Sequence, residues 1–256
     1  MEAMELLSAL FRWLHIAAGI LWIGLLYFFN FAYLPFAGSI DAETRSKVAP
    51  GLLGRALYFF RWAAMYSWVT GLLLLGIVFY HGGLMFEQGS EGWSTGSFVM
   101  IAVVFLLFGP YNALAKSPVG KNNFAFGLIS FIATGIVIYL MATVGSFGYR
   151  AYLIHTGAMF GTIMMANVWG SIWPGQKKVL AAIKEGTAPD ANLLATVQQR
   201  SRHNTYLSVP LIWTMINVHT TTTVAVEAWY YLLVVIAVGW LAVALVYRKA
   251  AKVKGF

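Results

Sequence analysis

The sequence contains no cysteine. This absence excludes disulfides, thiolate-ligated iron–sulfur clusters and the Cys-x-x-Cys-His attachment of c-type haem within this polypeptide. Any metal that the chain binds must therefore be held by histidine, methionine or oxygen ligands.

Charged residues are scarce as well. They make up 10% of the chain, whereas hydrophobic residues make up 60% and aromatic residues 16%. A soluble domain has roughly 25% charged residues, so the composition excludes that class and predicts an integral membrane protein. The first residues include Glu2 and Glu5, where a signal peptide would carry positive charge, so we expect the first apolar segment to be retained.

Apolar runs long enough to cross a bilayer recur along the whole chain. At about 20 apolar residues per crossing, the sequence predicts a single all-α transmembrane domain over residues 1–256, a bundle of seven transmembrane helices. The predicted spans are 7–34, 56–80, 96–115, 124–145, 149–173, 204–221 and 228–247. The predicted cytoplasmic loop 174–203 holds two stretches, 177–185 and 192–200, whose pattern suits short amphipathic helices.

The net charge of +8 has a topological explanation. Fourteen of the 17 basic residues fall in alternate loops and in the tail: Arg45, Lys47, Arg55, Lys116, Lys121, Lys177, Lys178, Lys184, Arg200, Arg202, Arg248, Lys249, Lys252 and Lys254. The opposite side carries Glu2, Glu5, Glu87, Glu91 and Glu227. The positive-inside rule therefore places the N-terminus outside and the C-terminus in the cytoplasm, and we expect no nucleic acid partner.

The chain has only five histidines, and four of them lie toward the outer ends of apolar segments: His15, His81, His155 and His219. Ionisable side chains are costly inside a membrane, so this cluster indicates a functional site. A haem is the obvious ligand for clustered histidines in a chain without cysteine.

His15 and His155 are the preferred axial ligands of a b-type haem, because they lie at similar depth, about eight and six residues from the outer ends of their spans. His15 shares one helical face with Gly19 and Trp22, and we expect the glycine to leave room for a flat macrocycle. A role for His15 in helix packing is the alternative. The Gly157-x-x-x-Gly161 spacing after His155 usually indicates close helix packing.

His219 is the reserve ligand, since it ends the sixth predicted span and could ligate iron, bond a propionate or serve a second site. His81 borders a glycine-rich loop, where a solvated histidine is the commoner case. Arg12 lies one turn outward of His15, where a guanidinium could pair with a haem propionate, and Arg150 lies at similar depth on the fifth span. Snorkelling toward the interface explains both arginines equally well.

His203 is separate from this group, because 16 residues of helix at about 1.5 Å each put it roughly 24 Å from His219. It lies beside the predicted cytoplasmic loops, among basic and amide groups that could hold an anionic planar substrate. The candidate substrate residues are His203, Asn204, Tyr206, Lys116 and Lys121. Lipid-headgroup anchoring is an equally good explanation of this group.

Several motifs together resemble the membrane domain at the N-terminus of the bacterial cytochrome c dependent urate oxidases. The resemblance covers nearly the whole chain, through residues 12–15, 19–24, 68–74, 116–122, 155–167, 174–178, 200–206 and His219. His15, His155, His203 and His219 fall at motif positions of that family, and His81 does not.

This resemblance implies a haem b enzyme of the bacterial inner membrane that oxidises urate to 5-hydroxyisourate and passes the electrons to a c-type cytochrome. In the family this cytochrome is commonly fused at the C-terminus. Because the sequence reaches Phe256 without a Cys-x-x-Cys-His motif, we expect a separate c-type cytochrome as acceptor.

Two other functions stay open at this point. A non-catalytic cytochrome b subunit, exchanging electrons with a quinone or a partner dehydrogenase in a larger assembly, would use the same histidines. A metal or small-molecule transporter is the least supported reading, because the spans lack paired carboxylates.

Overall fold

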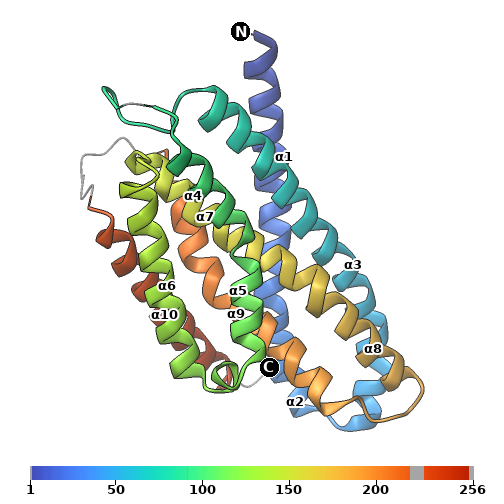
Figure 1. Ribbon diagram of the computed structural model, residues 1–256. Helices are drawn as coiled ribbons and strands as arrows, with labels where there is room; N and C mark the ends of the chain where they lie inside the picture. The colour runs from blue at the N-terminus through green and yellow to red at the C-terminus, as the bar shows by residue number, and fades with distance from the viewer. Residues whose placement is uncertain (1, 91, 220–227, 254–256) are drawn as a thin grey trace. The chain divides into compact units, whose positions relative to one another are not determined.

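The computed structural model describes residues 2–90, 92–219 and 228–253, and all regular structure within these ranges is helical (Figure 1). In chain order the elements are α1 (Glu2–Tyr27), η1 (Phe28–Tyr33), α2 (Leu34–Ser39), α3 (Ala42–Leu74), η2 (Leu75–His81), α4 (Thr95–Leu106), α5 (Phe108–Lys116), η3 (Pro118–Lys121), α6 (Asn123–Thr143), α7 (Tyr149–Asn167), η4 (Val168–Ile172), α8 (Trp173–Lys184), α9 (Ala191–Asn217) and α10 (Tyr230–Ala250). The all-α prediction is confirmed.

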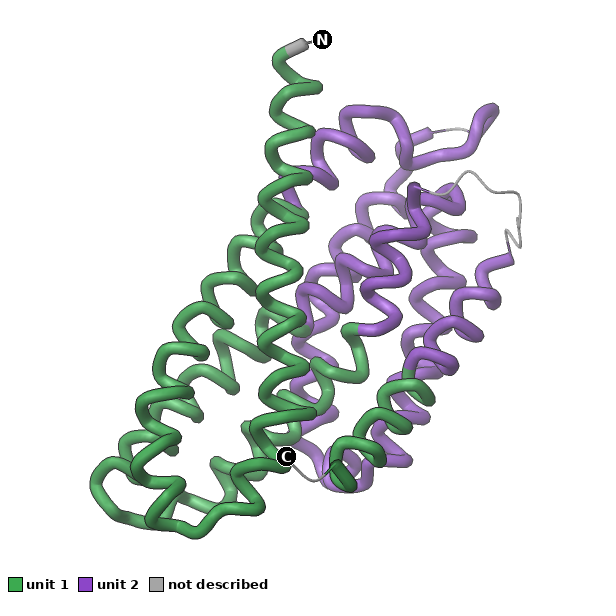
Figure 2. The backbone as a smooth tube through the Cα atoms, turned by 180° about the vertical axis from the view of Figure 1, so that it is seen from behind, with its two compact units in different colours: residues 1–71, 164–208, 240–256 green, residues 72–163, 209–239 purple. Residues whose placement is uncertain are grey.

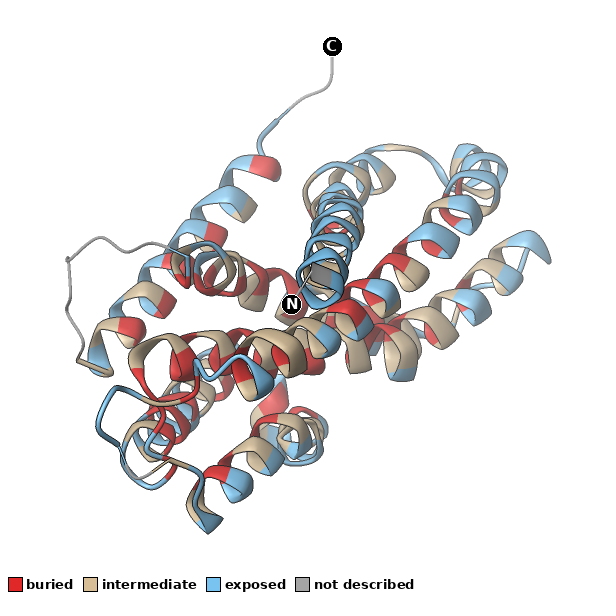
Figure 3. Cartoon of the chain, turned by 90° about the horizontal axis from the view of Figure 1, so that it is seen from above, coloured by how far each residue is buried: buried red, intermediate tan, exposed pale blue. Residues whose placement is uncertain are grey.

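Five helical segments among the described residues are long and apolar enough to cross a membrane. They are Ala3–Ser39, Ala42–His81, Thr95–Lys116, Asn123–Thr143 and Tyr230–Ala250. In their most apolar windows only 17–33% of the residues are buried, so most of this apolar surface faces outward, as a bilayer requires (Figure 3). These segments match five of the seven predicted spans.

The other two predicted spans, 149–173 and 204–221, are helical as far as the structure describes them. They lie on α7 with η4, and on α9, which carry more polar side chains. The end of the sixth span at 221 lies outside the described residues, as do Glu91, Glu227 and Lys254 of the charge argument. Crossing by these two helices, and the orientation of the bundle, stay predictions.

The helices in the region 174–203 are longer than the sequence suggested. Residues 174–203 were expected to be a loop with short helices, but α8 continues directly from η4, and α9 begins at Ala191. Both predicted amphipathic stretches are helical, and only 185–190 separates them. The predicted spans did not include most of α8 and the first part of α9, because hydropathy detects apolar residues and these helical segments are polar.

The chain, predicted as one domain, divides into two compact units (Figure 2). Unit 1 comprises residues 1–71, 164–208 and 240–256, and unit 2 comprises 72–163 and 209–239. His15, Asn204 and Tyr206 belong to unit 1, whereas His155 and His219 belong to unit 2.

Three segments of the helices are π-helical: η1, η2 and η4. A π-helical turn accommodates one more residue than an α-helical turn, and such turns are frequent at functional sites. Each of the three carries a side chain that bonds a neighbouring helix in its own unit: Asn30, Tyr80 and Trp169. The π-helical turns therefore lie where polar groups are paired.

Within unit 2, α4 begins at a capping box in which Ser94 and Ser97 exchange hydrogen bonds. The Ser97 hydroxyl is buried and also donates to the Gly145 carbonyl at 3.0 Å. Gly96 lies against the same turn, and a Cβ atom there would collide with the carbonyl oxygen of Val144. This contact packs the start of α4 against the end of α6.

We expect Gly96→Ala to destabilise the protein by about 1–3 kcal/mol, because the added methyl group meets backbone that cannot move aside. Gly109→Ala is the matched control, since Gly109 is helical and has open space around its Cα. It should be neutral or stabilising by about 0.5–1 kcal/mol. Unfolding of both variants in detergent checks this, and equal stability would show that the Gly96 contact is unimportant.

Candidate functional site

His15 is anchored in unit 1 through one ring nitrogen. Its Nδ1 donates to the carbonyl of Ser67 on α3 at 2.8 Å and lies 3.2 Å from the Thr70 hydroxyl. This bond fixes the tautomer and leaves Nε2 with its lone pair, the arrangement that metal-ligating histidines adopt. A Cβ atom on Gly71 would lie 3.0 Å from Cε1 of the His15 ring, so this glycine makes room for the imidazole.

The face of α1 that carries His15 packs on α3. The space beside Gly19 is taken by Ser67, whose hydroxyl would lie 3.6 Å from an added Cβ, so the room expected there for a macrocycle is filled by the neighbouring helix. Trp22 is buried, and its indole N–H has no hydrogen-bond partner in the described part of the chain. Arg12 is exposed, one turn from His15.

His155 is fully buried in unit 2 and shows the same anchoring. Its Nδ1 donates to the carbonyl of Ala151, one turn earlier on α7, at 2.7 Å. Nε2 therefore acts as an acceptor, and the hydroxyl of Tyr80 donates to it at 3.0 Å. The rings of Phe79 and Phe147 complete the surroundings, with centroids 6.5 and 4.8 Å from the imidazole.

Two local features hold α7 in place. The carboxylate of Glu87 accepts a hydrogen bond from the backbone N–H of Tyr149, at the first turn of the helix, at 2.9 Å. At Gly157 a Cβ atom would collide with the hydroxyl of Thr214 on α9, and at Gly161 it would lie 3.4 Å from Leu211. The Gly-x-x-x-Gly spacing after His155 thus serves close helix packing, as its usual meaning indicates.

The two outlying histidines are exposed. His219 lies in the turn after α9, and His81 ends η2. Exposure suits the solvated role that the loop sequence predicts for His81. Arg150, in the first turn of α7, is half-buried.

The candidate substrate residues divide between the units. Lys116 and Lys121 are exposed in unit 2. In unit 1, the amide of Asn204 is fully buried: it donates to the Met164 carbonyl at 2.9 Å and accepts from Asn167 at 2.9 Å. Both the nitrogen and the oxygen of the Asn204 side chain are therefore hydrogen-bonded to protein groups.

His203 and Tyr206 have different surroundings within unit 1. Burial, together with Arg200 and Arg202, lowers the pKa of His203 to about 3, so this ring is neutral at pH 7. Tyr206 stacks on Tyr247, with ring centroids 6.0 Å apart and an interplanar angle of 23°. The Arg202 guanidinium lies 5.9 Å from the Tyr206 ring and 5.5 Å from the Tyr247 ring, which gives this surface cationic and aromatic groups side by side.

Sequence reasoning missed three polar side chains that the structure places at central positions: Asn30, Tyr80 and Tyr247. Asn30 is buried in η1, donates to Leu26 and Ser201, and accepts from the Tyr247 hydroxyl at 2.9 Å. Asn30 could have been identified from the sequence, because an asparagine is unusual inside an apolar span. The two tyrosines could not, because tyrosine is common at membrane interfaces.

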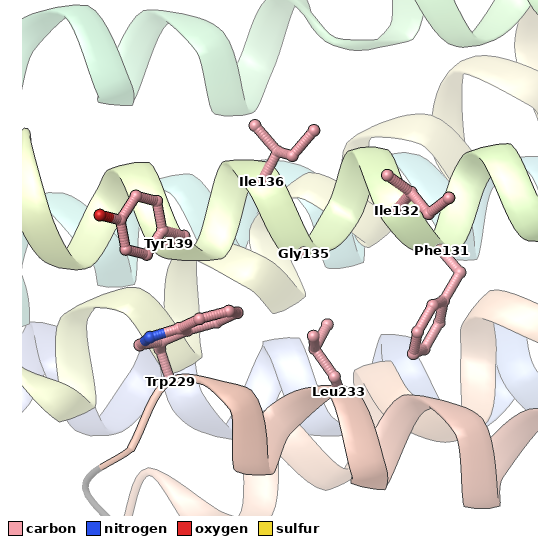
Figure 4. A pocket seen from close by; sticks show the side chains of 7 residues that line it. All are labelled: Phe131, Ile132, Gly135, Ile136, Tyr139, Trp229 and Leu233. Carbon is pink, nitrogen blue, oxygen red and sulfur yellow. The ribbon is translucent and has the colours of Figure 1, made fainter.

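An apolar groove of about 460 Å³ runs along α6 and the start of α10 in unit 2 (Figure 4). It is lined by Phe131, Ile132, Gly135, Ile136, Tyr139, Trp229 and Leu233. None of the predicted site residues lines it. Its walls suit hydrocarbon, as expected on a surface that faces a bilayer.

No group of three or more histidine, cysteine, aspartate or glutamate side chains that could hold a bare metal ion occurs among residues 2–90, 92–219 and 228–253. A haem needs only one or two protein ligands, because the macrocycle supplies the others. The donor chemistry of His15 and His155 fits such a ligand, since each has Nδ1 bonded to a carbonyl and Nε2 directed away from it.

The family described as urate oxidase N-terminal matches residues 34–255. No curated protein and no solved structure matches the chain.

We expect Asn204→Ala to destabilise the protein by about 1–3 kcal/mol, because it leaves the Met164 carbonyl and the Asn167 amide without this buried partner. Asn192→Ala is the control, since Asn192 is exposed at the start of the same helix. Thermal unfolding in detergent compares them. Equal unfolding temperatures would show that the buried amide pair contributes nothing.

Proposed function

We infer the function of this chain from its family: it belongs to the urate oxidase N-terminal family, whose match covers most of its length. It is an all-helical protein with several helices suited to a membrane, and its family relates it to an oxidoreductase.

We propose that this protein is a haem b oxidoreductase of the bacterial inner membrane, with seven spans, the N-terminus outside and the C-terminus in the cytoplasm. It oxidises urate to 5-hydroxyisourate and delivers two electrons, one at a time, to c-type cytochrome. Water supplies the added oxygen, and two protons are released, so the oxidation needs no molecular oxygen. A bound haem supplies one-electron relay between substrate and acceptor.

The observation that carries this proposal is the state of His155. A fully buried imidazole whose Nδ1 donates to a carbonyl, so that its Nε2 is an acceptor, has the tautomer that an axial ligand needs. His15, whose Nδ1 donates to the Ser67 carbonyl in unit 1, has the same tautomer. That both rings ligate one iron remains a prediction from their similar depth in the sequence, with His219 as the alternative ligand and Arg12 as the partner of a propionate.

The residues proposed for substrate binding are His203, Asn204, Tyr206, Lys116 and Lys121. Urate is a planar anion, and the surface of Tyr206 and Tyr247 with Arg202 offers aromatic faces beside a cation. The neutral ring of His203 can donate or accept a hydrogen bond there without adding charge. Asn204, bonded within the protein, would hold α7 and α9 in position for these groups.

The decisive experiment uses the purified full chain. Its reduced-minus-oxidised spectrum should show b-type haem, and urate added without oxygen should reduce that haem and then a supplied c-type cytochrome. Absence of haem absorbance would refute the proposal. Haem that dithionite reduces but urate does not would favour the non-catalytic cytochrome b subunit.

His15→Ala and His155→Ala should each remove the bound haem, because each deletes an axial ligand. His81→Ala is the matched control and should retain it, since His81 is exposed at the end of η2. The haem-to-protein absorbance ratio measures both effects. Normal haem content in both ligand variants would overturn the assignment.

Tyr80→Phe should raise the affinity for haem about 2–10-fold. The Tyr80 hydroxyl donates a hydrogen bond to Nε2 of His155, so iron can bind this nitrogen only after that hydrogen bond, which is of ordinary strength, is broken. Haem titration of the haem-free protein measures the change, with Tyr66→Phe, an exposed tyrosine of α3, as control. An unchanged or lower affinity in Tyr80→Phe would show that Tyr80 does not compete for this nitrogen.

A further inference from the structure

Arg61 of α3 is surrounded by aromatic rings in unit 1. Its guanidinium carbon lies 3.9 Å from the centroid of Trp173, on α8, and 5.8 Å from Trp169, in η4. Tyr58 and Trp62, on its own helix, lie at 5.5 and 5.7 Å. All four rings are within the range of cation–π attraction, so the guanidinium is held by aromatic groups from two segments.

Within residues 2–90, 92–219 and 228–253, this cation has no acidic partner. Among the described residues the recorded ion pair is Lys47 with Glu43, and the Nε–H of Arg61 is buried without a hydrogen-bond partner. Arg61 nevertheless lies inside the apolar segment Ala42–His81. Aromatic rings lower the cost of a charge in such a place but do not neutralise it, so the site lacks an anion.

The depth of Arg61 indicates where this anion comes from. It lies five residues inside the cytoplasmic end of the predicted span 56–80, about 7–8 Å along a helix. Trp169 and Trp173 lie at the corresponding end of the predicted span 149–173, and Lys177 and Lys178 follow one turn later. Tryptophans, tyrosines and basic residues gather at this level of a membrane, where lipid headgroups lie.

The surface next to Arg61 is open. Tyr58 is 51% exposed and Tyr66 is 59% exposed, and Tyr66 stacks on Trp62. On a membrane-spanning helix an exposed aromatic side chain faces lipid. A ligand of Arg61 can therefore arrive laterally from the bilayer.

We propose that Arg61, Trp169 and Trp173 form a binding site for the phosphate of an anionic glycerophospholipid in the cytoplasmic leaflet. A guanidinium presents a planar fork that bonds two phosphate oxygens at once, which an ammonium group cannot do. Basic pockets between spans on the cytoplasmic side are typical sites for such headgroups. The aromatic rings fix the position of the guanidinium, and the exposed Lys177 and Lys178 add positive charge that attracts an anionic headgroup.

The site is also fixed in position. The indole N–H of Trp169 donates to the Arg61 carbonyl at 3.1 Å, and Trp62 meets Trp169 edge-on at 5.4 Å. These contacts join η4 to α3 at the level of the guanidinium. The π-helical turn thus presents its indole to the backbone of the arginine, and the site does not depend on haem or urate.

The test measures how lipid shifts the unfolding temperature of the delipidated full chain in mixed micelles of detergent with either phosphatidylglycerol or phosphatidylcholine. Phosphatidylglycerol should stabilise the wild-type protein at a concentration at least tenfold below that of phosphatidylcholine. Arg61→Gln should remove this tenfold preference, and Arg61→Lys, which keeps the charge but not the fork, should reduce it at least threefold. Arg55→Gln is the matched control, and its preference for phosphatidylglycerol should stay within twofold of the wild-type preference. Arg55 is exposed on the same helix and donates to the Gly51 carbonyl one turn earlier.

Several results would overturn the proposal: equal effects of the two lipids on wild type, an unchanged preference in Arg61→Gln, or full stabilisation by inorganic phosphate or urate without lipid. If Arg61→Gln does not fold, native mass spectrometry of the wild type and of Arg61→Lys with equal amounts of both lipids decides. A wild-type preference of tenfold or more that falls in Arg61→Lys supports the site. Equal occupancy by both lipids contradicts it.

Discussion

The pairing of polar side chains with helix carbonyls is the constraint on which the rest of this structure depends. In a bilayer no water is present to satisfy a polar group, so a helix that carries one must supply its partner. His155, Asn30 and Thr70 each bond a carbonyl one turn earlier on their own helix, and His15 bonds a carbonyl of α3. In the two histidines and in Asn30 the bond leaves a second polar atom of the side chain, which can meet another helix or a ligand.

The three π-helical segments extend this principle. Because a π-helical turn departs from regular α-helical bonding, it changes which side chains face a neighbouring helix. In η1 the turn presents Asn30 to Ser201 and Tyr247, in η2 it presents Tyr80 to His155, and in η4 it presents Trp169 to the backbone of Arg61. Three of the polar contacts between helices thus involve a π-helical turn, whereas those of His15 and Asn204 are made from regular α-helix.

The sequence predicted the helices better than the contacts between them. Apolar runs predicted α1, α3, α6 and α10, because hydropathy and helix length coincide in a membrane. The region 174–203 was predicted less well, since charged amphipathic residues resemble a loop in a hydropathy profile although they continue a helix. His15 and His155 were found as unusual residue types. Their partners, the Ser67 carbonyl and the Tyr80 hydroxyl, lie 52 and 75 positions away along the chain, and nothing local to either histidine identifies them.

Polar groups of the spans therefore fall into two kinds. Asn30 and Asn204 are saturated by protein partners, and their role is to bring helices to fixed positions. The Nε–H of Arg61 and the indole N–H of Trp22 have none among the described residues, although both atoms are buried. Buried donors without a partner are rare in folded proteins, and a water, an ion or a ligand can meet their cost. In a membrane protein the possible ligands include a prosthetic group, a substrate and the lipid itself, so Arg61 and Trp22 are the positions at which to search for a bound molecule.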